Sequence, residues 1–90
     1  MADSYLARID VMLKPAVNDP QGLSVRDGLR ELGFDGVRSV RVGKHVEVTL
    51  EAADAAAAER AVHEMCERLL ANQIIETFSF DVAAAEPAEA

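Results

Sequence analysis

Apolar and polar side chains alternate along residues 5–14, and this pattern limits the segment to a strand with one buried face. The apolar face carries Tyr5, Ala7, Ile9, Val11 and Leu13. The same alternation recurs at 45–51 and 77–82, and residues 37–42 are predicted as a further strand. Four short strands are therefore expected.

Two segments between these strands have the spacing of amphipathic helices. The first is expected to begin at Pro20 behind an Asp19 N-cap and to close at Gly33, a residue that tolerates positive φ. The second is expected to span 55–71, with Asp54 as its N-cap. Each helix has one apolar stripe that needs a surface to cover it.

The order strand-helix-strand-strand-helix-strand predicts the α+β class and a ferredoxin-like β-α-β-β-α-β sandwich, in which two helices cover one face of a four-stranded antiparallel sheet. Gly43-Lys44 would join the two middle strands as a tight hairpin. The other sheet face should be open, lined by Arg8, Asp10, Met12, Arg41, Glu47, Thr49, Thr77 and Ser79. Residues 1–90 make a single domain, with order expected over about 5–82 and a flexible tail at 83–90.

Charge and composition narrow the choice of partners. The net charge of −7 argues against non-specific binding to nucleic acid or to anionic lipid, because both require clustered positive charge. The lone cysteine, Cys66, cannot form an internal disulfide, and neither a secretory segment nor a membrane-spanning run is recognisable. We expect a cytoplasmic protein whose small, aliphatic core gains stability from a partner.

The residues that could support chemistry are few. Cys66 lies on the apolar stripe of the second helix, where a thiol acts as a small hydrophobe. His63 is four residues from both Glu59 and Glu67, a spacing better explained by surface ion pairs than by a metal site. His45 is expected as a solvated residue beside a turn. Catalytic, cofactor-binding and metal sites are therefore all expected to be absent from this chain.

Several short blocks, taken in order, carry a family resemblance. They are Asp19-Pro20-Gln21-Gly22, then Val40-Arg41-Val42-Gly43-Lys44 with Glu47, then Glu64-Met65-Cys66-Glu67-Arg68-Leu69-Leu70-Ala71-Asn72, and finally Ile75-Glu76. Together they resemble the PurS family, the small subunit of phosphoribosylformylglycinamidine (FGAM) synthase in de novo purine synthesis. The likeness covers residues 5–82, nearly the whole expected fold.

The resemblance implies a noncatalytic subunit of a ligase complex, a glutamine amidotransferase. In that complex a glutaminase subunit releases ammonia, and a synthetase subunit uses ATP, Mg and formylglycinamide ribonucleotide (FGAR). The small subunit would bridge the two and support ammonia transfer, with no cofactor of its own. The resemblance further implies a homodimer or higher homo-oligomer, and it draws attention to Arg41, Gly43, Lys44 and Asn72 as partner contacts.

A stand-alone regulatory module of the same topology is the alternative. Such modules bind small molecules beside a helix-initiating glycine, and Asn18–Gly22 would be the site here. An RNA-recognition module would need aromatic side chains on the open sheet face, whereas Phe78 and Phe80 are expected on the core side.

Overall fold

The computed structural model describes residues 3–85. Its elements, in chain order, are β1 (Asp3–Leu13), α1 (Pro20–Glu31), β2 (Gly43–Ala52), α2 (Ala55–Met65), the π-helix η1 (Cys66–Leu70) and β3 (Glu76–Ala84). Because η1 continues α2 directly, one helical segment runs from 55 to 70. The chain is α+β, as the sequence predicts.

The three strands form one antiparallel sheet in the order β2-β1-β3. Ile9 in the central strand lies opposite Val46 on one side and Phe80 on the other. Since alternate residues of a strand face the same side, these positions belong to one apolar layer. The predicted faces of these three strands are therefore confirmed, whereas Arg41, predicted on the open face, lies outside the sheet.

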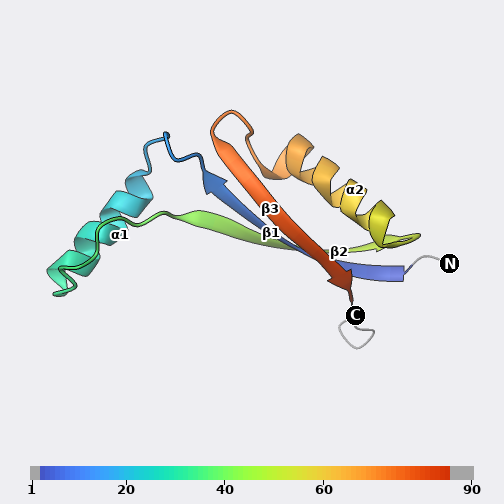
Figure 1. Cartoon of the computed structure of the whole chain (residues 1–90), viewed down its shortest axis with the longest axis horizontal. Helices are drawn as coiled ribbons and strands as arrows, with labels where there is room; N and C mark the ends of the chain where they lie inside the picture. The colour runs from blue at the N-terminus through green and yellow to red at the C-terminus, as the bar shows by residue number, and fades with distance from the viewer. Residues whose placement is uncertain (1–2, 86–90) are drawn as a thin grey trace.

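The core lies between this apolar layer and α2, which runs along one face of the sheet (Figure 1). Ala58, Val62 and Cys66 of the helical segment are fully buried. Val62 and Cys66 form one cluster with the central strand's Ala7, Ile9 and Val11, which are also fully buried. Partly buried side chains from both edge strands complete the cluster: Val46, Val48, Leu50, Phe78, Phe80 and Val82.

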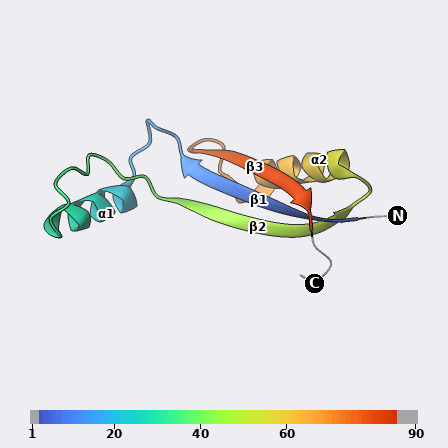
Figure 2. The same cartoon turned by 60° about the horizontal axis from the view of Figure 1, so that its bottom comes forward.

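Helix α1 lies beyond the end of the sheet and not on its face (Figures 1 and 2). It begins as expected, with Asp19 as N-cap and a proline in its first turn, and the chain turns after it at Gly33, where φ is 101°. Gly22 is the one residue of α1 that is buried. The helix therefore projects from the sheet as an arm with little of its own surface covered.

The ferredoxin-like prediction is wrong on two counts. Within residues 3–85 the sheet has three strands, not four, and α1 covers no sheet face. Residues 37–42 form irregular chain, and Gly43, expected in a hairpin, is already paired with Met12 in β1. The Val42 amide donates to the Asp19 side chain. The Val42 N–H thus finds its hydrogen-bond acceptor at the base of α1, and the segment does not fold back to pair with β2.

The flexible tail was predicted to begin at residue 83, but β3 continues through Ala84. Residues 83 and 84 belong to β3, where they pair with the start of β1. Residues 86–90 of that expected tail lie outside the described part of the chain.

Candidate interaction site at the base of helix α1

Asp19 connects two segments that are far apart in sequence. Its Oδ1 accepts a hydrogen bond from the Gly22 amide at 2.8 Å, which caps α1. Its Oδ2 accepts one from the Val42 amide at 2.9 Å, immediately before β2. The side chain is only 9% exposed. One carboxylate therefore holds the first turn of the arm against the chain that enters the sheet.

The same donors keep this carboxyl ionised. The Val42 N–H contributes most to lowering the pKa of Asp19, the Gly22 N–H adds to it, and the Arg41 guanidinium acts in the same direction. Burial opposes them with a smaller effect than either hydrogen bond. Both hydrogen bonds are consequently charge-assisted, the stronger kind.

Arg41 ties this segment to the end of β1. Its Nη2 donates to the carbonyl oxygen of Leu13 at 2.6 Å and to that of Lys14 at 3.1 Å. Its Nε lies 3.8 Å from Oδ2 of Asp19. The guanidinium, expected on an open surface as a partner contact, is thus occupied within its own chain.

Gly22 allows the two segments to approach closely. A Cβ atom at this position would collide with the backbone carbonyl of Val40, so a larger residue would force the segments apart. We refer to Asp19, Gly22, Arg41 and Val42 together as the α1 junction. It accounts structurally for two of the sequence blocks on which the family resemblance depends.

The remaining predicted contact residues lie at the same end of the sheet. Gly43 and Lys44 begin β2, opposite Met12 and Val11 of β1. Asn72 belongs to the turn that leads into β3, whose first residue pairs with Leu13 at the end of β1.

Asn72 organises that turn. Its backbone N–H donates to Oε1 of Glu76 at 2.7 Å, and its Oδ1 accepts from the Ile74 amide at 3.1 Å. Its carbonyl oxygen accepts from the amides of Ile75 and Glu76. The structure therefore gathers Arg41, Gly43, Lys44 and Asn72 at the end of the sheet from which α1 projects.

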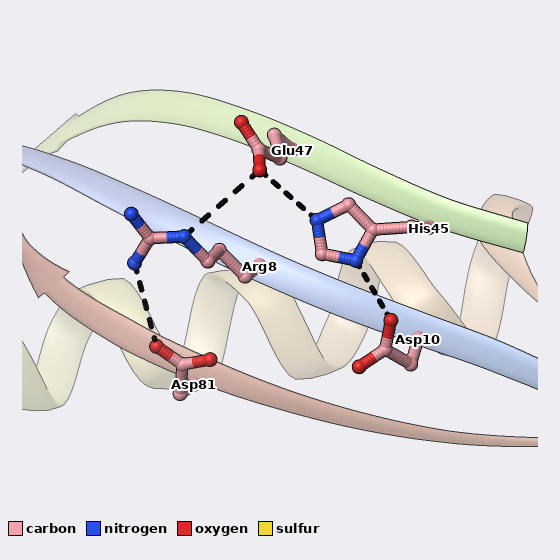
Figure 3. A network of polar contacts seen from close by, with 5 residues as sticks. All are labelled: Arg8, Asp10, His45, Glu47 and Asp81. Atoms are coloured by element: carbon pink, nitrogen blue, oxygen red, sulfur yellow. Dashed lines mark hydrogen bonds and ion pairs between the residues drawn. The ribbon is translucent and has the colours of Figure 1, made fainter.

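The sheet face opposite α2 carries a network of charged side chains (Figure 3). Arg8 lies 3.9 Å from carboxylate oxygens of both Glu47 and Asp81. His45 Nδ1 is 2.7 Å from Oδ1 of Asp10, and its Nε2 is 3.0 Å from Oε2 of Glu47. The hydrogen bond to Asp10, followed by that to Glu47, raises the pKa of His45. The network links all three strands.

His45 is exposed, as predicted, but the turn expected beside it is not formed. It lies within β2 opposite Asp10, because β2 begins two residues earlier than predicted. The sequence signal that could have revealed the pairing is the alternation of polar residues on this face, read together with the antiparallel register.

The other candidate groups have structural roles. Cys66 is buried, and burial raises the pKa of its thiol. His63 Nδ1 lies 3.2 Å from Oε1 of Glu67, the predicted surface ion pair, and its ring meets Phe78 edge-on. Across residues 3–85 there is no group of three or more His, Cys, Asp or Glu side chains arranged to hold a metal ion.

The Asn18–Gly22 segment already supplies its own ligand. The Gly22 amide, to which an outside anion or amino acid would bind, donates to the Asp19 carboxylate. This occupancy speaks against the regulatory-module alternative. Among the described helices none is long and apolar enough to cross a membrane.

Exposed apolar side chains are concentrated in two places. Leu23, Val25, Leu32 and Phe34 lie on α1 and the turn after it, and Leu69, Ile74 and Ile75 lie near the turn that contains Asn72. Leu32 is 76% exposed and Phe34 57% exposed. In a protein this small, so much exposed apolar surface marks interaction sites.

The comparisons with known proteins agree with this arrangement. The family model for PurS, described as phosphoribosylformylglycinamidine (FGAM) synthase, matches residues 6–84. The chain belongs to the PurS family. The PurS subunit of Synechocystis is 50% identical over 88 residues, covering 98% of this chain and 88% of the relative. That of Bacillus subtilis is 41% identical over 78 residues, covering 87% of this chain and 92% of the relative.

Solved structures of the family have the same fold. PurS of Bacillus subtilis superposes with a TM-score of 0.79 at 40% identity, covering 88% of this chain and 98% of that one. A chain of the PurLQS structure from Thermotoga maritima superposes with a TM-score of 0.82 at 30% identity, covering 89% and 98%. The chain is thus a PurS subunit of FGAM synthase and functions in purine biosynthesis.

Proposed function

We propose that this PurS-family chain serves FGAM synthase as a noncatalytic scaffold. It pairs with a second copy of itself through the α1 arm, and the pair bridges a glutaminase subunit and a synthetase subunit. In this role the chain holds no cofactor, while ATP and Mg are used in the synthetase. The proposed location of the complex is the cytoplasm.

The absence of a catalytic constellation among residues 3–85 supports the noncatalytic role. The thiol of Cys66 is buried with a raised pKa, which suppresses the reactive thiolate. His45 is engaged with two carboxylates, and His63 with Glu67. None of these groups is paired with a nucleophile in a way that would activate it.

The shape of the chain carries the proposal that it pairs with a second copy. Its Cα radius of gyration is 17.1 Å, whereas a compact chain of 90 residues has one of about 12 Å. Its extents of 54 × 32 × 16 Å reflect the projecting arm. A chain so extended is completed by a neighbour that fills the space beside the arm.

The surface area points the same way. The chain exposes 6408 Å², whereas a folded monomer of 9.7 kDa exposes about 5,100 Å². The excess exceeds the roughly 800 Å² that each partner buries in a standard interface. The exposed Leu23, Val25, Leu32 and Phe34 supply the apolar contacts that such an interface needs.

The need for a bridge follows from the chemistry of ammonia. At neutral pH ammonia in water is mostly protonated, and the ammonium ion has no lone pair with which to attack an activated amide. Two enzymes held in register with a water-excluding path between them avoid that loss. A rigid, catalytically inert subunit is suited to this task, and the likeness to a chain of the Thermotoga maritima PurLQS structure supports a place in such an assembly.

Lys44 and Asn72 are the proposed contacts with the larger subunits, together with Arg41 and Gly43 beside them. Lys44 is an exposed cation next to the arm, and the Asn72 turn presents the exposed Ile74. Arg41 and Gly43 would act by holding this end of the sheet in shape, because the first is bonded to Leu13 and Lys14 and the second is paired with Met12.

Assembly of the purified subunits tests the proposal. Glutaminase and synthetase are mixed with FGAR and nucleotide and passed over a sizing column, with and without this chain. We expect the two enzymes to migrate together only when the chain is present. Lys44→Glu should lower the yield of the complex, whereas Arg60→Glu, a charge reversal at an exposed position of α2, should not. Full complex formation without the chain would remove the bridging role.

A further inference from the structure

The direction of the arm is fixed by very few contacts. Helix α1 buries only Gly22, so core packing does not hold it, in contrast to α2, which buries Ala58 and Val62 against the sheet. The arm is joined to the sheet by residues 14–19 at one end and 32–42 at the other. Whatever sets its angle must therefore lie where these two connections meet.

We propose that Asp19 is a positioning residue whose carboxylate, by bridging the first turn of α1 and Val42, sets the direction in which the arm leaves the sheet. The arm's apolar face is thereby presented to a second copy of the chain. This inference rests on the proposed pairing for its consequence, but the bridge itself is a local property of one chain.

The two oxygens of Asp19 have separable roles. A helix cap requires a single acceptor, and Oδ1 supplies it to Gly22. Oδ2 is free to serve another segment, and it accepts the Val42 amide 23 residues further along the chain. The hydrogen bond from Val42 holds α1 in position, as burial against the sheet holds α2.

Asp54 shows what a cap without a bridge looks like. It caps α2 with Oδ1, which accepts from the Ala57 amide at 2.7 Å, and this contact is exposed. It makes no bond to a distant segment among the described residues. Asp54 is therefore the natural control for Asp19.

The neighbours of Asp19 complete a three-way connection. Arg41 holds the segment before β2 to the carbonyl oxygens of Leu13 and Lys14 at the end of β1. At Gly22 the missing side chain lets the carbonyl of Val40 lie against α1. Together these contacts fix α1, β1 and the approach to β2 at one point, where a small rotation would swing the far end of the arm.

The variant Asp19→Asn separates the cap from the bridge. Asparagine is as good an N-cap as aspartate, so its oxygen can still accept from Gly22. Asparagine has one acceptor oxygen where aspartate has two, so while the cap is kept its amide nitrogen faces the Val42 N–H and cannot accept from it. Asp54→Asn makes the same chemical change at a cap that bridges nothing.

Spin labels report the direction of the arm. The labels are attached through Glu31→Cys and Glu51→Cys, both at exposed positions, in a chain that also carries Cys66→Ala. An excess of unlabelled chain ensures that each pair contains at most one labelled copy. We expect a narrow distance distribution for the parent and for Asp54→Asn, and a broad or displaced one for Asp19→Asn. Circular dichroism establishes that the helices persist.

Sedimentation of the same variants reports the consequence for pairing. Loss of a hydrogen bond to a charged group corresponds to roughly a tenfold weaker equilibrium, so Asp19→Asn should raise the dissociation constant of the dimer by about tenfold. Asp54→Asn should leave it within about twofold. Gly22→Ala adds a Cβ that would collide with the Val40 carbonyl and crowd the Asp19 carboxylate. It keeps the aspartate but forces the segments apart, and so provides a second route to the same result should Asp19→Asn fold poorly.

The two readouts keep the proposals distinguishable. The positioning role would be overturned if the label distances in Asp19→Asn and Gly22→Ala had the same mean and the same width as in the parent. A parent chain that sediments as a monomer would instead remove the proposed pairing, while the label distances would still decide whether Asp19 directs the arm.

Discussion

At the scale of single residues, Gly22 and Gly28 occupy the same helix in opposite circumstances. A side chain at Gly22 would collide with the Val40 carbonyl, whereas nothing lies within 4 Å of a Cβ placed at Gly28. Glycine destabilises a helix because the unfolded chain has more conformational freedom at glycine than at alanine. Replacing it with alanine removes this entropic cost only where the added side chain has room. The two positions therefore form a matched pair.

We predict that Gly28→Ala stabilises the protein by about 0.5–1 kcal/mol and that Gly22→Ala destabilises it. Denaturant unfolding at one fixed protein concentration measures both. Equal stabilisation by the two substitutions would show that the close approach at Gly22 carries no strain, contrary to the account of the α1 junction.

His45 should titrate with a raised pKa. The hydrogen bond from its ring to Asp10, and then that to Glu47, favours the protonated imidazole, so its pKa should lie above the ordinary value of about 6.5. NMR titration of the ring protons measures this directly. Asp10→Asn should bring the pKa down toward the ordinary value, and a parent pKa at or below that value would contradict the geometry of Figure 3.

The sign of the effect on stability follows from the raised pKa. The contribution of His45 is complete below about pH 6.5, where the imidazole is protonated in both the folded and the unfolded chain. It is lost as the pH rises through the folded-state value. Unfolding measured on both sides of that window should show stability falling with rising pH, with a smaller fall in His45→Gln.

At the scale of elements, the core depends on how α2 meets β1. Val62 is fully buried among Ala7, Ile9 and Val11, all of which belong to one strand. Because the three strands have one helical segment to cover their apolar layer, each buried side chain on that segment has no substitute.

We predict that Val62→Ala lowers the free energy of unfolding by about 2 kcal/mol, from lost burial and from the cavity that is left. Glu59→Ala, on an exposed position of the same helix, should change it by less than about 0.5 kcal/mol. Denaturant unfolding of the two variants checks both, and a Val62 effect as small as that of Glu59 would argue that α2 does not form the core.

Local periodicity predicted the elements better than their arrangement. Strands β1 and β3, the apolar stripe of α2 and the caps at Asp19 and Asp54 all follow from spacing within a few residues. Residues 37–42 have a strand-like composition, but a strand also needs a neighbour with free backbone groups, and composition does not report one.

Prediction of the candidate site from the sequence has the same limit. The sequence indicated Arg41, Gly43, Lys44 and Asn72 through the family resemblance, and the structure gathers them at one end of the sheet. It could not indicate that Asp19 reaches Val42, because a bond across 23 residues leaves no local signature. The hydrogen bonds from Arg41 to Leu13 and Lys14 could not be predicted for the same reason.

At the scale of the whole molecule, the projecting arm is the property that most needs a partner. Leu32 and Phe34 lie at its far end, and within residues 3–85 no other element covers them, so both are largely exposed. We predict that the chain sediments at twice 9.7 kDa or more, and that Leu32→Asp with Phe34→Asp shifts it toward the monomer.

The matched control is Leu69→Asp, a similarly exposed leucine in the second apolar patch, near the Asn72 turn. It should leave the dimer intact. Dissociation by the Leu69 variant but not by the arm variant would locate the self-interface at the Asn72 turn, and the arm would then lose its proposed role.

The central claim is that this chain contributes to FGAM synthesis by holding other subunits together and not by chemistry of its own. The most direct measurement is FGAM formation by purified glutaminase and synthetase, with glutamine or with ammonium as the nitrogen source, in the presence and absence of this chain. We predict that omission abolishes most of the glutamine-dependent rate and leaves the ammonium-dependent rate largely intact. Glutamine-dependent synthesis that proceeds equally well without the chain would contradict the claim.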